Sequence, residues 1–154
     1  MSRVKQRRLY LLRDFKFRTS YISILVGQLT RCGKKNKAIK YLTIALFFIK
    51  QRTGLNPLLI LQQAINNIKP LVELKKKTVA GKVYHIPAPL RKYRDFKLGV
   101  RWLLEAAKKQ HGKNLGECLG REIMDASSYQ GSAVTKKMEY YNIVIANRPF
   151  IFFK

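Results

Sequence analysis

Acidic residues are scarce in this chain of 154 residues, where eight Asp and Glu stand against thirty-two Lys and Arg. The formal net charge is +24, and Asp14 is the only acid before Glu73. A protein of this charge repels itself unless a polyanion neutralises it. The composition therefore indicates nucleic acid as the leading partner. The alternative is a helical protein held on an anionic membrane by a basic arm and an apolar tail.

Cysteine and histidine are also scarce, and neither type is spaced for metal or catalytic chemistry. Cys32 and Cys118 lie far apart and beside no histidine pair, so we expect a reducing compartment and no disulfide framework. "CGKK" alone is no phosphate-binding loop. We therefore expect no enzyme, no cofactor and no metal site. A ribonuclease that uses His85 and His111 is the remaining catalytic alternative.

Long apolar runs are absent. The longest one without charge, "YLTIALFFI" at 41–49, is far shorter than the roughly twenty residues that cross a bilayer. We therefore expect no membrane span. The hydrophobic content of 47% suits one packed core. We predict a basic N-terminal arm at residues 1–14, retained in the mature protein, and a single domain at residues 15–154.

Apolar residues recur at the three- and four-residue spacing of helices in six segments. Gly54 is expected to end the second helix, while Asn56 caps the third and Pro57 begins it. The predicted buried stripes are Ile22, Leu25, Val26, Leu29; Ile39, Leu42, Leu46, Ile49; Leu58, Leu61, Ile65, Ile68; Phe96, Val100, Leu103, Ala107; Leu115, Leu119, Ile123; and Val134, Met138, Tyr141, Ile145.

Two short extended runs predict a β-hairpin over about residues 72–87, with Ala80-Gly81 in the bend. The predicted fold class is therefore mainly α: a bundle-like domain of six helices with a hairpin projecting between helices 3 and 4. The tail "FIFFK" is too apolar for a solvated terminus, so we expect it to dock on another part of the protein.

Basic residues gather in clusters that contain hardly an acid. A single run of charge is commonly just a solvated face, but several such runs together suit a surface that follows a phosphate backbone. On the predicted helix at 94–110, Arg94, Lys97, Arg101 and Lys108 share a face apart from the apolar stripe. The other clusters are Arg3, Lys5, Arg7, Arg8; Lys34, Lys35, Lys37; Lys75, Lys76, Lys77, Lys82; and Arg91, Lys92, Arg94.

Five motifs together resemble the small-ribosomal-subunit protein seven family. They are "GKKNKA" at 33–38, "NPLLILQQAINNIKPLVELKKKTVAGKVYHIP" at 56–87, "RWLLEAAKK" at 101–109, "GSAVTKK" at 131–137 and "ANRPF" at 146–150. The resemblance covers most of the chain from about residue 15 and implies six helices with a hairpin after the third. It implies a structural protein that binds the three-prime major domain of small-subunit rRNA and helps nucleate assembly of the subunit head. It also implies nearby exit-site tRNA and mRNA, and proteins nine and eleven as neighbours.

The resemblance extends to particular residues. Arg101 is expected to face RNA and Trp102 to lie in the core, while Tyr84 either stacks on a base or packs at the hairpin root. The complete set of predicted RNA-binding residues is Arg3, Lys5, Arg7, Arg8, Lys34, Lys35, Lys37, Lys75, Lys76, Lys77, Lys82, Tyr84, Arg91, Lys92, Arg94, Arg101, Lys108, Lys136, Lys137 and Arg148.

Two departures from the family pattern concern the ends of elements. Ala80-Gly81 stands where the family has paired glycines, and "FIFFK" replaces a tail that resembles His-Tyr-Arg-Trp.

Lysine outnumbers arginine twenty to twelve, and Ile, Phe, Tyr and Asn are plentiful, as in AT-rich coding. Because the family-like region begins near the start of the sequence, we expect no presequence. We interpret the chain as a mitochondrion-encoded ribosomal protein, with a plastid or a bacterial cytoplasm as the alternatives.

Overall fold

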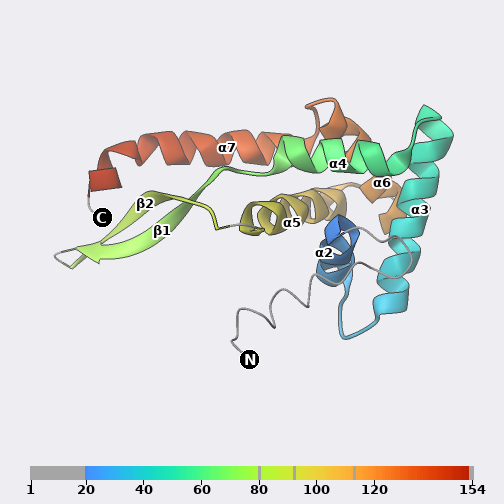
Figure 1. Ribbon diagram of the computed structural model, residues 1–154, viewed down its shortest axis with the longest axis horizontal. Helices are drawn as coiled ribbons and strands as arrows, with labels where there is room; N and C mark the ends of the chain where they lie inside the picture. The colour runs from blue at the N-terminus through green and yellow to red at the C-terminus, as the bar shows by residue number, and fades with distance from the viewer. Residues whose placement is uncertain (1–19, 80, 92, 113, 153–154) are drawn as a thin grey trace.

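Figure 1 shows the computed structural model, which describes residues 20–79, 81–91, 93–112 and 114–152. This part of the chain holds six α-helices and a hairpin between the third and fourth of them, which confirms the predicted fold class. The arm at residues 1–14 lies outside it. The elements are α2 (Ser20–Leu29), α3 (Lys35–Thr53), α4 (Pro57–Ile68), β1 (Val72–Val79), β2 (Lys82–Pro89), α5 (Arg94–Lys109), α6 (Leu115–Ser127), α7 (Ser132–Ala146) and the 3-10 helix η1 (Arg148–Phe152).

Local signals set the ends of α3 and α4 as predicted. Gly54 follows α3 with φ of +67°, the left-handed conformation that favours glycine. The side-chain oxygen of Asn56 accepts a hydrogen bond from the Leu58 amide at 3.0 Å, and Pro57 is the first residue of α4. The sequence therefore encodes the sharp turn between these helices through Gly54, Asn56 and Pro57, which lie close together in the chain.

Helix α6 is the centre of the packed body, where it contacts α3, α4, α5 and α7. A Cβ on Gly116 would come within 2.8 Å of the Ile44 side chain, and one on Gly120 within 2.9 Å of Phe48. These two glycines let α6 lie directly against α3. The buried carboxylate of Glu122 on α6 accepts hydrogen bonds from the Ala133 amide at 2.8 Å and the Gln110 side chain at 2.5 Å, so it ties the start of α7 to the body.

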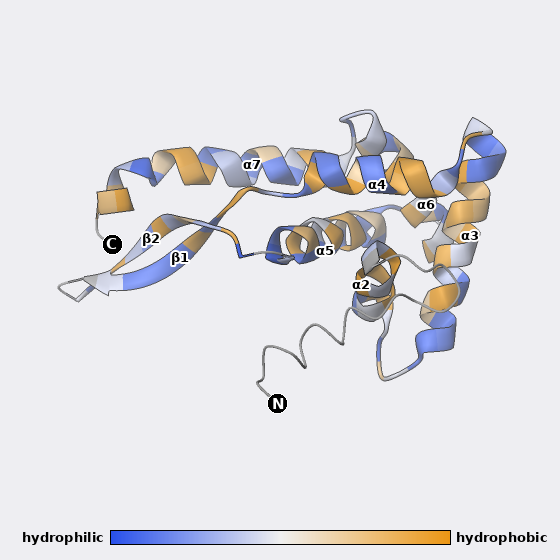
Figure 2. Cartoon of the chain, in the orientation of Figure 1, coloured by the Kyte–Doolittle hydropathy of each residue, from blue (hydrophilic) through white to orange (hydrophobic). Residues whose placement is uncertain are grey.

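The predicted stripes of α2 to α6 form the core. Most of their members are buried, while Ile39, Leu58 and Leu115 are partly buried and pack against the others. In Figure 2 apolar residues recur along α3, α4 and α5, whereas most of β1 is hydrophilic. We call α2 to α6 with the first turn of α7 the packed body.

The predicted buried stripe of α7 is wrong at two of its four members, while Tyr141 is half-buried. Val134 is buried, but Met138 is 57% exposed and Ile145 is 65% exposed. The physical reason is that α7 runs past the end of the packed body and continues beside the hairpin (Figure 1). The second half of α7, the hairpin and η1 together form what we call the arm from here on; this name does not refer to the N-terminal residues 1–14.

The hairpin is two residues longer than predicted, since β2 ends at Pro89. Val79 pairs with Lys82, and Gly81 in the bend has φ of +78°. Its root is held by α7, because the Leu74 amide donates to the Tyr140 hydroxyl oxygen at 2.9 Å.

The apolar tail docks in part, as the sequence suggested. The ring of Phe150 lies 5.1 Å from that of Tyr84 between centroids, whereas Phe152 is 92% exposed. Within the described ranges no single helix is long and apolar enough to cross a bilayer; α3 and α4 meet that test only together, across a bend of 102°.

Candidate nucleic-acid interface

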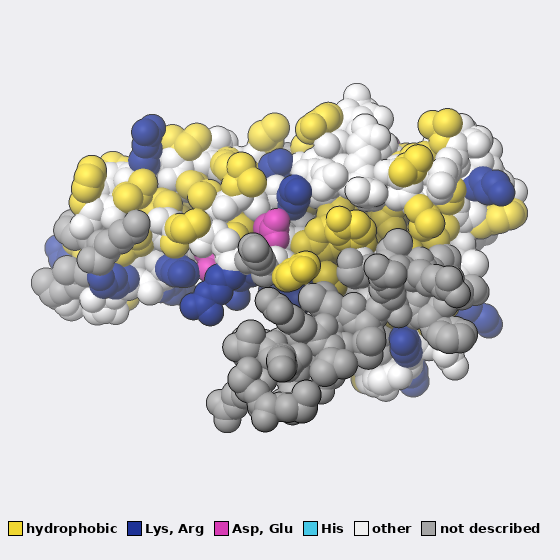
Figure 3. Space-filling view, viewed as in Figure 1, with side chains coloured by type: hydrophobic (Ala, Val, Ile, Leu, Met, Phe, Trp, Pro, Cys, Tyr) yellow, Lys and Arg dark blue, Asp and Glu magenta, His cyan; other side chains and the backbone are white. Residues whose placement is uncertain are grey.

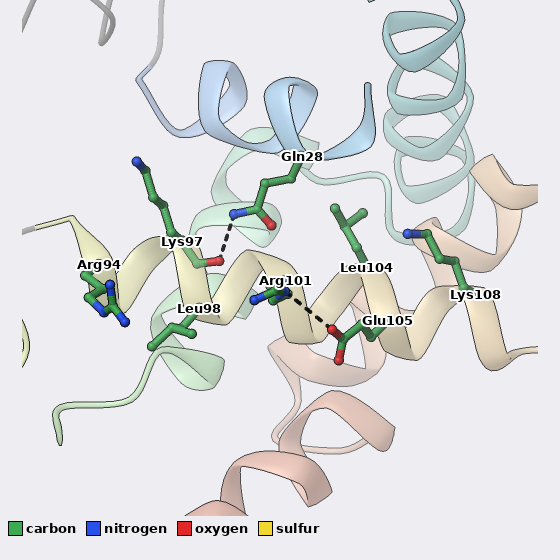
Figure 4. A pocket seen from close by; sticks show the side chains of 8 residues that line it. All are labelled: Gln28, Arg94, Lys97, Leu98, Arg101, Leu104, Glu105 and Lys108. Atoms are coloured by element: carbon green, nitrogen blue, oxygen red, sulfur yellow. Dashed lines mark hydrogen bonds and ion pairs between the residues drawn. The ribbon is translucent and has the colours of Figure 1, made fainter. Parts of the chain in front are cut away.

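The basic face predicted for the fourth helix lines a groove between α2 and α5. Positions three and four residues apart on a helix share one side, so the α5 side chains line up along the groove. The cavity measures about 560 Å³. The described residues that line it, drawn in Figure 4, are Gln28, Arg94, Lys97, Leu98, Arg101, Leu104, Glu105 and Lys108.

A second cavity of about 330 Å³ continues this basic surface towards the loop before α3. It is lined by Arg31, Lys34, Lys37 and Tyr41 among others, and Lys108 lines both cavities. The two hollows are therefore neighbours along one stretch of surface. We call the cations that line them the basic track: Arg31, Lys34, Lys37, Lys108, Arg101, Lys97 and Arg94.

The start of α3 adds a fixed partial charge to the track. Lys34 occupies the N-cap position without a side-chain hydrogen bond, and no acidic residue stands in the first turn. The N-terminus of a helix carries partial positive charge, so cations there are unfavourable and an anion is stabilising. This end of α3 is therefore built against its own dipole unless an anion is bound beside it.

The hairpin carries lysines on both faces. Lys76 is opposite His85, and Lys77 is opposite Tyr84, so Lys76 points to one face while Lys75 and Lys77 point to the other. All three lysines are exposed. Figure 3 shows Lys and Arg side chains gathered over this part of the molecule.

Glu73 joins the hairpin to the basic track. Its side chain is only 11% exposed and forms an ion pair with Arg94 at the start of α5. Lys75 Nζ lies 4.0 Å from the same carboxylate. Because the partner on α5 also lines the groove, the hairpin lysines and the groove form one connected cationic surface.

Lys136 and Lys137 are both engaged within the protein. Lys136 forms an ion pair with Glu105, and Lys137 Nζ donates to the carbonyl oxygen of Asn67 at 2.6 Å. Burial, and secondarily the nearby charge of Lys69, lower the pKa of Lys137. Both side chains hold α7 against the body, and their contact with RNA stays a prediction.

The remaining predicted residues are spread over the arm and its base. Lys82, Arg91 and Arg148 are exposed, Lys35 is exposed beside the track, and Trp102 is buried as predicted. Tyr84 is half-buried against Phe150, which favours packing over base stacking. Arg3, Lys5, Arg7, Arg8 and Lys92 lie outside the described residues.

Sequence reasoning did not single out Gln28, Arg31 or Glu105 as members of this surface. Glu105 could have been found, since it follows Arg101 by four residues on the same face of α5. Gln28 is neutral and joins the groove only because α2 packs across α5, where its side-chain amide donates to the Lys97 carbonyl at 2.8 Å.

The two histidines do not meet. His85 is exposed on β2, before the start of α5, and His111 is exposed just after its end. A helix of 16 residues is about 24 Å long, so α5 keeps them apart. No group of three His, Cys, Asp or Glu side chains in the described part of the chain could hold a metal ion.

Comparison with known proteins identifies relatives along nearly the whole chain. The family model of ribosomal protein S7p/S5e matches residues 1–148. The small ribosomal subunit protein uS7 of Thermoanaerobacter pseudethanolicus is 34% identical over 144 residues, covering 94% of this chain and 92% of the relative. The protein of the same name from Synechococcus elongatus is 35% identical over 141 residues, covering 92% and 90%.

Proposed function

The chain belongs to the ribosomal protein S7p/S5e family, and we propose that it binds the three-prime major domain of small-subunit rRNA through the basic track and the hairpin lysines. Membership makes it a structural, non-enzymatic protein of the small ribosomal subunit. The two-histidine ribonuclease is thereby set aside, in agreement with the separation of His85 and His111.

The observation that carries the proposal is the continuity of the cationic surface. Lys108 belongs to both cavities, and Arg94 connects the groove with the hairpin root. Each phosphate that a lysine or arginine neutralises releases counterions, which favours binding to a folded RNA with many phosphates along its path. A ribbon with lysines on both faces suits contact with two RNA segments at once.

The proposed role of the protein within the subunit follows from the family resemblance. We propose that binding helps nucleate assembly of the subunit head, and that the protein lies near the exit-site tRNA and the mRNA path, with the tip of the hairpin towards the exit site. Proteins nine and eleven are the expected neighbours. The exposed apolar residues Met138, Ile145 and Phe152 on the arm suit a protein contact rather than an RNA contact.

We also propose that the ribosome is mitochondrial. The support is compositional: twenty lysines against twelve arginines, with many Ile, Phe, Tyr and Asn residues. Sedimentation of the tagged protein with the mitochondrial small subunit in a cell fraction is the expected result. Recovery with plastid or bacterial subunits instead would contradict this compartment.

The proposed RNA contact is tested by binding the full-length protein to the three-prime major domain and to a scrambled RNA of equal length, over a series of salt concentrations. We expect a preference for the rRNA domain that persists near physiological salt. If the affinities for the two RNAs were equal and fell together as the salt concentration rose, the protein would bind RNA only as a non-specific polycation. Competition by anionic liposomes would then favour the membrane alternative.

A further inference from the structure

The groove between α2 and α5 contains a carboxylate that a surface for phosphate alone does not need. Among the described residues that line the groove, Glu105 is the one acid. Its side chain is 41% exposed and that of the neighbouring Arg101 is 69% exposed, so both are open to a ligand. A carboxylate repels phosphate, so we expect the RNA group beside Glu105 to be something other than a phosphate.

The hydrogen-bonding capacity of the pair is only partly used inside the protein. One carboxylate oxygen of Glu105, Oε2, is taken by Lys136. The other, Oε1, forms an ion pair with Arg101, whose Nε lies 3.6 Å away, beyond hydrogen-bond distance. A guanidinium N–H and a carboxylate oxygen therefore stand next to each other, one as a donor and the other as an acceptor.

Gln28 supplies a second acceptor from the opposite wall. One N–H of its Nε2 donates to the Lys97 carbonyl at 2.8 Å, which fixes the amide and leaves Oε1 as an acceptor and the second N–H as a donor for a ligand. Figure 4 shows Gln28 reaching from α2 towards α5, with Arg101 and Glu105 side by side. Leu98 and Leu104 add apolar surface to the lining of the groove.

From this arrangement we propose that the groove holds one unpaired nucleotide of the RNA, with the Watson–Crick edge of its base against Arg101 and Glu105. The inference rests on the proposed function. Donor beside acceptor is the pattern of a base edge, and two acceptors favour a base with an exocyclic amino group. Sequence-specific RNA recognition commonly uses such unstacked bases. Lys97 and Lys108 bind the flanking phosphates.

The size of the groove agrees with this occupant. Its volume of about 560 Å³ lies within the range of roughly 300–1,000 Å³ typical of small-molecule sites. Phosphate contacts position an RNA, whereas contacts with base edges specify its sequence. The groove therefore gives the protein a means of selecting its rRNA target that the lysine-rich hairpin does not offer.

The test compares Glu105→Ala with Glu139→Ala, which removes an equal charge from an exposed position on α7. Thermal unfolding first checks that both variants are folded. The affinity of each variant for the rRNA domain and for the scrambled RNA is then measured. We expect E105A to bind the rRNA domain about tenfold more weakly and the scrambled RNA no more weakly, because the lost base contact is one that the scrambled RNA does not make. E139A should tighten binding to both RNAs slightly.

Three results would overturn the inference. E105A could tighten both interactions as E139A does, which would make Glu105 a repulsive charge only. It could weaken both equally, which would make it a positioning residue for Arg101 and Lys136. A wild-type protein without any preference for the rRNA domain would overturn the proposed function as well, so the two failures are distinguishable.

A second measurement identifies the base directly. The rRNA domain is prepared with nucleoside analogues that lack the exocyclic amino group of G, A or C. We expect one position at which the analogue weakens binding by the wild type but not by E105A. Equal sensitivity of the two proteins at every position would contradict a contact between Glu105 and a base.

Discussion

The packed body and the arm are stabilised in different ways. The body has a contiguous apolar core in which Leu103, Leu119 and Ile123 are fully buried. The arm is held at a few points, among them the Tyr140 hydroxyl on the Leu74 amide and the Phe150 ring on Tyr84. A packed helical body can therefore orient an exposed ribbon whose own composition, rich in lysine, could not support a core.

The largest difference is expected between Leu103→Ala in the body and Met138→Ala in the arm. Leu103 is 0% exposed, so its truncation should cost about 2–5 kcal/mol of unfolding free energy. Met138 is 57% exposed, so its truncation should change stability by no more than about 0.5 kcal/mol. Chemical denaturation measures both, and equal costs would mean that body and arm share one core.

Glu122→Ala tests the joint between the body and α7. The change removes the acceptor for the buried Ala133 amide and for the Gln110 side chain, at a cost of about 1–3 kcal/mol. Asp125→Ala on the exposed side of α6 is the matched control and should have little effect. Denaturation midpoints that move together in both variants would show that the buried carboxylate does not secure α7.

The hairpin lysines are tested by replacing Lys75, Lys76 and Lys77 together with Ala. Each lost phosphate contact should flatten the dependence of log affinity on log salt by up to about 0.9, the duplex figure. The preference for the rRNA domain over scrambled RNA should largely remain, because these lysines bind backbone. An unchanged salt slope would mean that the three lysines do not meet phosphate.

Tyr140→Phe gives the smallest expected effect, at the root of the arm. The Leu74 amide loses its acceptor, which should cost about 0.5–1.5 kcal/mol. Burial raises the pKa of Tyr140 above 10.0, so its protonated form is favoured by folding. The wild type should therefore lose stability as pH rises from 10 through the folded pKa, and Y140F should not show that loss. Denaturation at pH 8 and above 10 measures it, and parallel curves would contradict the raised pKa.

Much of the fold was predictable because its signals are local. Asn56, Pro57 and Gly54 determine the ends of two helices whatever surrounds them. The exposure of Met138 was not predictable, since it depends on where the body ends beneath α7. Periodicity reports which residues share a face of a helix but not whether another element covers that face.

The candidate interface was predictable in part for the same reason. The basic face of α5 follows from spacing alone. The contribution of Gln28 depends on how α2 crosses α5, and the internal bonds of Lys137 depend on how α7 meets α4. A lysine that donates to a carbonyl within the protein has the same sequence signature as one that is free to bind RNA.

The most direct test of a single RNA-binding surface is amine-reactive footprinting of the full-length protein, with and without the rRNA domain. We expect RNA to protect Lys97 and Lys108 in the groove together with the hairpin lysines Lys75, Lys76 and Lys77. Lys50, exposed near the turn between α3 and α4, should stay reactive. Protection of the hairpin lysines without the groove lysines, or equal protection of Lys50, would show that the groove and the hairpin do not form a single RNA-binding surface.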